Sequence, residues 1–321
     1  MKHNIDITSS GQRLDIFLLG KMPGLSRSKI QKKIKEGGVK VNGKTVAPHY
    51  FLKAGDVVDL SGRKNTKASE EKLIEKKRVP AKKIPKIQLD KIVIGETDEF
   101  LIINKPSGIA VHGQPGDDPK IKASLIDIVA KKYPAIKKIG DDPCRPGVVH
   151  RLDKEVSGVM VIAKSQASFE NLKRQFMERE VKKTYVALVY GRIEKDEGVI
   201  DFPIERSREG KMAARPANQP GKIAVTHFKV IKRYINYTLL EARPKTGRTH
   251  QIRAHLAAYG NPIVGDNLYS TKDSREKNKK LDLGRIFLAA IELSIKNLSG
   301  EELTFRAGLP KKLKELLEII K

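Results

Sequence analysis

The sequence predicts an α+β fold with a mixed, largely antiparallel sheet, preceded by a small α/β module. The chain has 321 residues, a length typical of about two domains. From residue 89 onward, strand and helix patterns are mixed without strict alternation and joined by short turns, which favours α+β. Residues 62–88 are rich in Lys and Glu, hold two prolines and lack aromatics. We therefore expect a module over 1–61, a basic flexible linker over 62–88 and a domain over 89–321.

The small module is predicted to contain two helices and a short sheet. Leu14 and Phe17 recur at helical spacing, and Ser26 can cap a second helix. The pair Asn42-Gly43 is a strong signal for a hairpin turn. The expected elements are helices around 14–18 and over 27–36, and strands over 39–41 and 57–60.

The larger part of the chain carries short apolar strand patterns and amphipathic helix patterns. Two of the strands are separated by three residues and are expected to pair antiparallel. We expect strands over 92–94, 100–103, 159–163, 184–190, 226–233 and 237–242, and helices over 124–132, 165–180, 249–259 and from 310 onward.

The charge balance points to a polyanionic partner. Lys plus Arg number 64 and Asp plus Glu 38, which gives a net charge of +26. Nucleic acid is the first candidate, because each neutralised phosphate releases counterions. An anionic membrane surface is a weaker candidate, since no basic amphipathic helix with aromatic anchors is evident. A solvated basic surface without a partner is the plain alternative.

Composition also disfavours several other classes. No stretch is apolar enough to cross a bilayer, and the first 15 residues lack the apolar core of a secretion signal. A single cysteine, Cys144, excludes an internal disulfide and a multi-cysteine metal site. Phosphate loops of the types GxxxxGK[ST] and GxGxxG do not occur. We expect a cytoplasmic protein, and a monomer, since no oligomerisation surface is evident.

Three polar segments adjoin predicted strands, and polar loops at strand ends are where sites are built. They cover residues 104–108, 150–158 and 246–253. Within the second, Asp153 lies between Arg151 and Lys154, and it is a candidate nucleophile or base. A turn cap or a surface salt bridge is the structural alternative for a lone Asp.

Other side chains have ordinary structural interpretations. Tyr185 lies in a predicted strand and is normally a core residue, while Arg248 and Arg253 are by default phosphate binders or surface charges. His250 and His255 are five residues apart, so they do not share a helix face. No cysteine or close carboxylate completes a tetrahedral set, and we expect no metal.

Taken together, the segments resemble the RluA family of pseudouridine synthases. HRLDKEVSG at 150–158 is similar to the family's catalytic motif, and NKPSGIAVH at 104–112 to its first motif. KKTYVALVYG at 182–191 is similar to its tyrosine strand, GRTHQIRAHL at 247–256 to its arginine motif, and NPIVGDNLY at 261–269 to the segment that follows. The matches occur in the family's order and cover residues 90 to about 308.

The N-terminal module resembles an S4 RNA-binding domain over residues 13–60, a pairing typical of family members that act on large-subunit ribosomal RNA. GVVHRLDKEVSG, KMAARP and GKIAVTHF favour the RluD-like branch, with the RluC-like branch as second choice from AVHG. The S4 residues expected to contact RNA are Arg27, Lys29, Lys32 and Lys33.

Two positions depart from the family pattern. Val156 stands where the family usually has Thr, which removes a hydroxyl near the nucleophile. Ala289 stands where the family often has His, although the apolar Leu288 before it is kept. Val156 therefore cannot make the hydrogen bond of that hydroxyl, and the role of the His is not available at Ala289.

The resemblance implies an activity and a role for each site residue. The enzyme would isomerise specific uridines of 23S ribosomal RNA to pseudouridine after base flipping, without cofactor, energy source or metal. Asp153 would be the nucleophile, acting by attack at C1′ or by abstraction of the C2′ proton, and Arg248 its ion-pair partner. Tyr185 would stack on the uracil and Leu288 would close the apolar side. The remaining substrate-binding residues would be Arg151 in the vacated space, His150, Lys105 and Arg253.

Two other functions stay open on the sequence. A non-catalytic RNA-binding or ribosome-assembly factor on the same fold is suggested only by Val156 and Ala289. A carbohydrate glycosidase using Asp153 and Glu155 fits poorly, because residues two apart in a loop do not set the required carboxylate separation. Its neutral substrate would also not need a net charge of +26.

Overall fold

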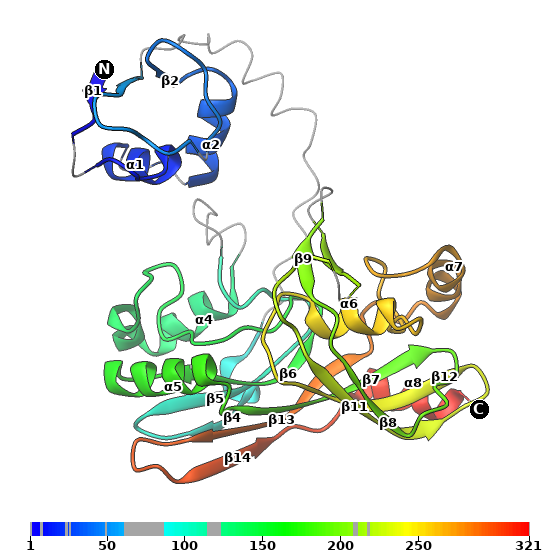
Figure 1. Ribbon diagram of the computed structural model, residues 1–321. Coiled ribbons are helices and arrows are strands. Elements are labelled where there is room, and N and C mark those ends of the chain that lie inside the picture. Colours follow the sequence, from blue (N-terminus) through cyan, green and yellow to red (C-terminus); the bar gives the residue numbers. More distant parts are fainter. Residues whose placement is uncertain are drawn as a thin grey trace. The chain divides into compact units, whose positions relative to one another are not determined.

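The computed structural model describes residues 2–6, 9–22, 25, 27–48, 50–60, 87–113, 123–207, 211–216 and 219–320 (Figure 1). Contacts divide the chain into two compact units, with the main boundary between residues 84 and 85. The predicted linker over 62–88, including its expected helical part, lies almost entirely outside the described residues.

The first unit combines two helices with a three-stranded sheet. Helices α1 and α2 supply one apolar face each, and these faces bury Leu18 and Ile30 completely. Asn42 and Gly43 have φ values of 51° and 76°, as a type I′ turn requires, so the predicted turn is confirmed. The elements are β1 (Lys2–Asn4), α1 (Leu14–Lys21), α2 (Arg27–Lys35), β2 (Lys40–Val41) and β3 (Val57–Asp59), with strand order β1-β3-β2.

The second unit is built on a nine-stranded sheet (Figure 1). Its order is β4-β5-β6-β13-β7-β12-β11-β8, with β14 also paired to β13. Of the pairings in the described residues, β13 with β6 is parallel and the others are antiparallel, which confirms the predicted α+β class. The strands are β4 (Val93–Glu96), β5 (Phe100–Lys105), β6 (Ser157–Ala163), β7 (Lys182–Tyr190), β8 (Glu197–Ile200), β11 (Thr226–Arg233), β12 (Tyr237–Pro244), β13 (Leu288–Lys296) and β14 (Glu302–Arg306).

A separate two-stranded sheet and several helices complete this unit. Helices α4 and α5 lie side by side near the β5–β6 end of the sheet, and α6 packs against β10 (Figure 1). Ser165 caps α5 by accepting from the Ser168 backbone N–H, as the sequence predicts. The elements are β9 (Ile204–Arg206), β10 (Met212–Ala214), η2 (Leu89–Lys91), η3 (Pro134–Lys138), α4 (Leu125–Lys132), α5 (Gln166–Glu178), α6 (Gln251–Ala258), α7 (Lys272–Leu281) and α8 (Lys311–Ile319).

The middle of the large sheet is the core of this unit. Every residue of β6 is buried, and β5 and β13 on either side of it are nearly so. Burying one such Val, Ile or Leu side chain contributes roughly 1.5–3 kcal/mol. This continuous apolar packing holds the first residue of β6, and therefore the polar loop before it, in a fixed position.

Gly158, the second residue of β6, fixes where that loop meets β13. It has a φ of 128°, and a Cβ built there would lie 2.0 Å from the Ala290 carbonyl oxygen. A side chain is therefore excluded at this position by both conformation and space. The close approach brings the loop over 150–156 to the start of β13, next to Leu288.

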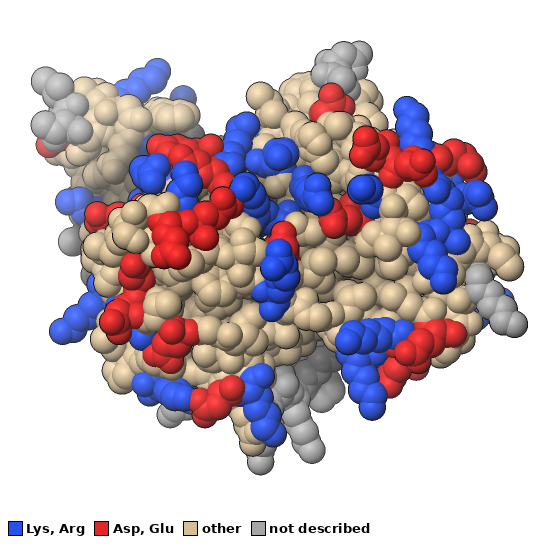
Figure 2. All heavy atoms as spheres, turned by 90° about the horizontal axis from the view of Figure 1, so that it is seen from below, with Lys and Arg blue, Asp and Glu red and all other residues tan. Residues whose placement is uncertain are grey.

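On at least one face of the molecule, positive side chains do not form a continuous patch (Figure 2). Figure 2 shows one side of the molecule, on which Lys and Arg side chains are interspersed with Asp and Glu around broad uncharged areas. None of the helices in the described part of the chain combines the length and apolarity needed to span a bilayer.

Candidate active site

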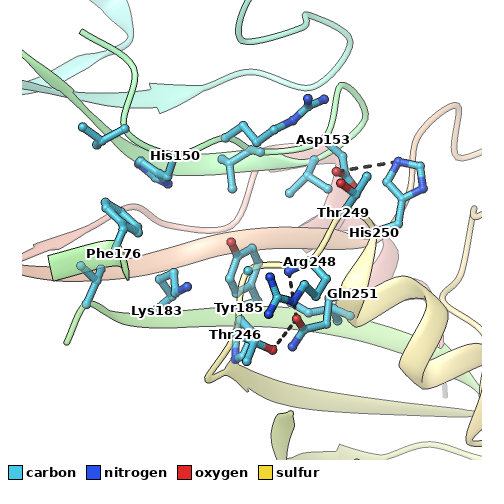
Figure 3. A pocket seen from close by; sticks show the side chains of 18 of the residues that line it. His150, Asp153, Phe176, Lys183, Tyr185, Thr246, Arg248, Thr249, His250 and Gln251 are labelled. Atoms are coloured by element: carbon cyan, nitrogen blue, oxygen red, sulfur yellow. Dashed lines mark hydrogen bonds and ion pairs between the residues drawn. The ribbon is translucent and has the colours of Figure 1, made fainter. Parts of the chain in front are cut away.

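A pocket of about 590 Å³ lies where the loop over 150–156, strand β7, the start of β13 and the start of α6 meet (Figure 3). Asp153 is the one carboxylate among its described lining residues. Seven lining residues are basic: Arg145, Arg151, Arg179, Lys183, Lys245, Arg248 and Arg253. The pocket therefore favours an anionic ligand and keeps a single negative side chain within reach of it.

Asp153 has few contacts of its own. Its side chain is 15% exposed, and Oδ2 accepts a hydrogen bond of 3.2 Å from Nη1 of Arg253. The other carboxylate oxygen, Oδ1, lies 3.8 Å from Nε2 of His250. A carboxylate with one charge-assisted hydrogen bond is oriented by it and still keeps lone pairs free for chemistry.

Arg253 is held in place by a second carboxylate. Its Nε and Nη2 donate to the two oxygens of Asp266, at 2.7 and 3.0 Å, while Nη1 extends to Asp153. Asp266 is fully buried and also accepts from the backbone N–H groups of Leu268 and Tyr269. Burial lowers the pKa of Arg253, but Asp266 first and Asp153 second raise it above its usual value. The guanidinium is thus permanently charged and fixed in direction.

The ion-pair partner predicted for Asp153, Arg248, is corrected by this geometry. Arg253 makes the contact, whereas Nε of Arg248 donates to the carbonyl oxygen of Ile223 at 3.1 Å. The reason is local geometry: Arg253 lies in the first turn of α6 and lines the pocket, while Arg248 lies in the loop before the helix. Arg248 still lines the pocket near Tyr185 (Figure 3).

Tyr185 and Leu288 lie on two neighbouring strands, β7 and β13, in the middle of the sheet. Tyr185 extends from β7 toward the loop that carries His150 and Asp153 (Figure 3). Burial, and then the charge of Asp153, raise the pKa of the Tyr185 phenol above its usual value, so the hydroxyl stays protonated. Leu288 is buried and contributes an apolar wall.

His150 forms part of the pocket wall. Its Nε2 accepts a hydrogen bond from the Val161 backbone N–H at 3.0 Å, and its ring is stacked on Phe176 with centroids 4.5 Å apart. Burial, with a smaller effect of Lys183, lowers the pKa of His150 to about 3. A neutral, hydrogen-bonded ring in this place ties the loop to β6.

Lys105 does not meet the expectation of a substrate contact. Its side chain is fully buried, and Nζ donates to the carbonyl oxygens of Pro106, Ile109 and Lys154. Ser107 adds a hydrogen bond from its hydroxyl to the Glu155 carbonyl. A charged group without water is stable only when its donors are satisfied, so the ammonium faces inward. The NKPSG segment therefore fastens the loop that bears Asp153.

The other predicted RNA contacts differ in how far they are described. Arg151 is exposed and lines the pocket, as a residue that enters a vacated base position must. The side chains of Arg27, Lys29 and Lys32 on α2 lie outside the described residues. Lys33 is half-buried, and its aliphatic part lies close to Gly38.

Three residues near Asp153 were not assigned a role from the sequence: His250, Asp266 and Tyr269. His250 has a left-handed backbone at the start of α6, and its Nδ1 lies 3.0 Å from the Tyr269 hydroxyl. Asp266 and Tyr269 belong to NPIVGDNLY, a segment whose resemblance to the family was noted without a function. A single Asp or Tyr in a sequence does not by itself indicate a functional role. The contacts of Asp266 and Tyr269 with Arg253 in the structure reveal that they belong to the site.

The two positions that depart from the family pattern are both apolar in their surroundings. Val156 is buried in the main core and lines the pocket, and Ala289 is buried opposite Ser157 of β6. Among the described residues, no group of three His, Cys, Asp or Glu side chains is arranged to hold a metal ion.

Comparisons with known proteins agree with this fold. The RNA pseudouridylate synthase family model matches residues 99–258, and the S4 domain model matches residues 12–58. Ribosomal large subunit pseudouridine synthase C of Haemophilus influenzae is 35% identical over 96% of this chain and 91% of its own. The uncharacterized RNA pseudouridine synthase YlyB of Bacillus subtilis is 32% identical over 98% of each chain. The structure of human RNA pseudouridylate synthase domain containing 4 has a TM-score of 0.57, with 26% identity, over 73% of this chain and 95% of that one.

A mixed sheet with a basic pocket around one carboxylate, together with an S4 module, defines an RNA-modifying enzyme of two modules. The chain belongs to the RNA pseudouridylate synthase family, and within it to the RluA family. It is an RNA pseudouridine synthase, an isomerase that forms pseudouridine in RNA. Relatives named synthase C correspond to the second of the two predicted branches, and the RluD-like assignment stays a prediction.

Proposed function

We propose that this enzyme isomerises specific uridines of 23S ribosomal RNA, with Asp153 as the nucleophile. The observation that carries the proposal is the position of Asp153, the single described carboxylate in a pocket lined by seven basic residues. The relatives named large-subunit synthases and the S4 domain support the choice of substrate. We expect the enzyme to meet this RNA in a pre-ribosomal particle.

Asp153 has the contacts that a nucleophile needs. The reaction breaks the bond between N1 and C1′, forms one between C5 and C1′, moves a proton off C5 and places one on N1. An ionised carboxylate can begin it by attack at C1′ or by taking the C2′ proton, and both remain open. Arg253 holds Oδ2 by a charge-assisted hydrogen bond, which leaves Oδ1 for the sugar.

Tyr185 supports the base during this rearrangement. Its ring lies on the floor of the pocket, on the strand next to Leu288, and a uracil between the two would be held by stacking on one side and apolar contact on the other. The protonated phenol carries no charge to repel a uracil anion after the N1–C1′ bond breaks. Its hydroxyl can also take part in moving the C5 proton.

The basic lining supports RNA capture and base flipping. The target atom is accessible only after the nucleotide leaves its stack, at a cost of a few kcal/mol that is smaller in a loop than in a duplex. Lys183 is largely buried, and burial lowers its pKa, so a nearby phosphate would offset the cost of its charge. Arg151 is exposed at the rim, two residues before Asp153, where it can occupy the space left by the flipped base.

The test compares wild type with Asp153→Asn on unmodified large-subunit RNA, followed by chemical mapping of pseudouridine along the transcript. Discrete new sites with wild type and none with the variant are expected, while both proteins bind the RNA. If both proteins bind and neither modifies, the assembly-factor alternative replaces the proposal. Modification by Asp153→Asn at the wild-type rate would remove Asp153 from the role of nucleophile.

Two further predictions accompany this function. We expect a monomer, which light scattering during size-exclusion chromatography of the full chain checks directly. We also expect a cytoplasmic enzyme, because the proposed substrate is ribosomal RNA, and cell fractionation with an antibody tests that.

A further inference from the structure

His250 stands out beside Asp153 because its backbone is strained. It precedes α6 with φ 55° and ψ 22°, in the left-handed region that few residues other than Gly adopt, although His, like Asn and Asp, occurs there more often than most. Such strain persists where the surrounding structure fixes it, and it tends to occur at functional sites. The conformation turns the imidazole toward Asp153 (Figure 3).

The imidazole lies between two partners. Nε2 is 3.8 Å from Oδ1 of Asp153, and Nδ1 is 3.0 Å from the Tyr269 hydroxyl. The Tyr269 ring meets the imidazole edge-on, at a centroid distance of 5.7 Å, and the Arg253 guanidinium lies 5.2 Å from the Tyr269 ring centre. Tyr269 thus packs on both groups that face the carboxylate.

Hydrogen bonding selects the tautomer of this histidine. The backbone N–H of Met212 points to the Tyr269 oxygen, so the phenol proton is free to be donated to Nδ1. A neutral imidazole that accepts at Nδ1 carries its proton on Nε2, on the side of Asp153. The opposite tautomer would direct a lone pair at the carboxylate and is disfavoured.

The charge of His250 follows from all the groups that face it. Burial lowers its pKa most, and Arg253 adds to this effect. Asp153, Asp266 and Glu155 oppose it, but the net direction is downward. The ring is therefore neutral at neutral pH, and it offers Asp153 an N–H donor rather than a second full positive charge.

We propose that His250 is a positioning residue for Asp153, and that Tyr269 fixes the tautomer with which it does so. In this arrangement Arg253 holds Oδ2 and the Nε2–H of His250 directs Oδ1, so the carboxylate is aligned on both oxygens when the uridine binds. The inference rests on the proposed role of Asp153 and deepens it. A neutral donor aligns the carboxylate without withdrawing as much charge from it as an imidazolium would.

The experiment measures the single-turnover rate constant on saturating RNA for the full chain, from pH 5 to pH 9. The variants are His250→Ala, His250→Gln, His250→Asn, Tyr269→Phe and the double variant His250→Gln with Tyr269→Phe. Gln places an amide N–H near the position of Nε2, whereas Asn places one near Nδ1. His227→Gln on β11 and Tyr237→Phe on β12 are matched controls, because neither residue lines the pocket.

We expect His250→Ala and His250→Asn to lower the rate constant about a hundredfold at unchanged RNA affinity, and His250→Gln to recover about tenfold of this. Tyr269→Phe should lower the rate about tenfold and move the acid limb of its pH profile upward. The sign follows because loss of the phenol donor frees Nδ1 to bind a proton, which raises the pKa of His250. In the double variant the acid shift should be absent, since Gln does not titrate.

Two results would overturn the inference. One is wild-type activity in His250→Ala. The other is equal loss in the Ala, Asn and Gln variants with unchanged pH profiles and lowered melting temperatures, which would mean a purely structural role. Asp153→Asn, measured alongside, separates the two proposals. If Asp153→Asn is active, the proposed role of Asp153 is wrong, and the role of His250 that rests on it falls with it. If Asp153→Asn is inactive while the His250 variants are fully active, only the proposed role of His250 is wrong.

Discussion

Asp153 and Asp266 are two carboxylates on one guanidinium, and they are treated very differently by the chain. Asp266 is fully buried and receives two hydrogen bonds from Arg253 and two from backbone N–H groups. Asp153 is 15% exposed and receives one hydrogen bond, from the remaining nitrogen of Arg253. The saturated carboxylate sets the direction of the guanidinium, and the sparsely bonded one is left for chemistry.

The same division runs through the rest of the site. Lys105 and His150 make hydrogen bonds inside the protein, through Nζ and Nε2 respectively, and each fastens one end of the loop over 150–156. Arg151 is exposed beside them. A reactive side chain therefore does not need a strained or highly bonded setting of its own, provided that its neighbours are fully bonded.

The largest effect on the reaction rate is expected from a change at Asp153, the carboxylate with one hydrogen bond. Asp153→Asn should lower the rate of pseudouridine formation by roughly 10⁴-fold or more, because the proposed nucleophile is lost. Urea unfolding should show a change in the free energy of unfolding below about 1 kcal/mol, since one hydrogen bond changes partner type. A large loss of stability in this variant would erase the distinction between the two carboxylates.

Arg253→Lys should disturb the contacts with Asp266 and with Asp153 at the same time. A lysine offers a point charge rather than a fork, so it cannot serve Asp266 and Asp153 together. We expect a rate lowered by about 10²–10³-fold and a free energy of unfolding lowered by roughly 3 kcal/mol, because a buried carboxylate loses its partner. Rate measurements and urea unfolding on one protein preparation check both numbers.

Asp266→Asn should act mainly on stability. The amide would present a donor to the Arg253 fork or to a backbone N–H, at a cost of roughly 2–3 kcal/mol in the free energy of unfolding. The rate should fall only about tenfold, since Arg253 can still reach Asp153. A rate loss as large as that of Asp153→Asn, with unchanged stability, would contradict the assignment of Asp266 as the anchor.

His150, which fastens the loop that bears Asp153, should make the free energy of unfolding depend on pH. Burial lowers its pKa in the folded protein to about 3, against about 6.5 unfolded, so the unfolded chain binds more protons between these values. The stabilising contribution is present above about pH 6.5 and is lost as the pH falls below it, by about 2 kcal/mol between pH 7 and pH 5. Urea unfolding at both pH values should show a smaller difference in His150→Gln than in wild type.

The smallest effect is expected for Arg248. Arg248→Met should weaken RNA binding about tenfold and reduce the slope of log affinity against log salt by about 1, because one phosphate contact is lost. Its melting temperature should stay close to wild type, in contrast to Arg253→Lys. Binding titrations at two or more salt concentrations test this, and an unchanged slope would remove Arg248 from the RNA contacts.

Periodicity predicted most of the elements that the structure contains. Apolar runs such as 159–163 and capped amphipathic segments such as the one after Ser165 were found, because their signals are local. The elements β8 to β10, α7, β13 and β14 were not assigned. The sequence of α7, KDSREKNKKL, has almost no apolar face, and β8, β9, β10 and β14 have only three to five residues each, too few for a period to be recognised. Strand β13 has nine residues, so shortness does not explain why it was missed.

The candidate site was predicted unevenly for a related reason. The motif of residues 150–158 identified Asp153, since its resemblance to the family is carried by consecutive residues. The choice between Arg248, in the loop before α6, and Arg253, in its first turn, depends on how that loop and the helix pack against the pocket, and this is set by tertiary structure. Likewise Lys105 lies in a recognised motif, but only its burial reveals that it fastens a loop rather than touching RNA.

The buried amine of Lys105 offers a way to measure how often the loop over 150–156 opens, because its Nζ donates a hydrogen bond to the Lys154 carbonyl of that loop. Burial lowers the pKa of Lys105 to about 7, so a sizeable share of its amines are uncharged and nucleophilic at neutral pH. They are shielded from reagents only while the carbonyls of Pro106, Ile109 and Lys154 enclose them. The rate at which an acylating reagent labels Lys105 should therefore report how often the loop opens spontaneously. Mass spectrometry can measure this labelling rate without RNA and without turnover.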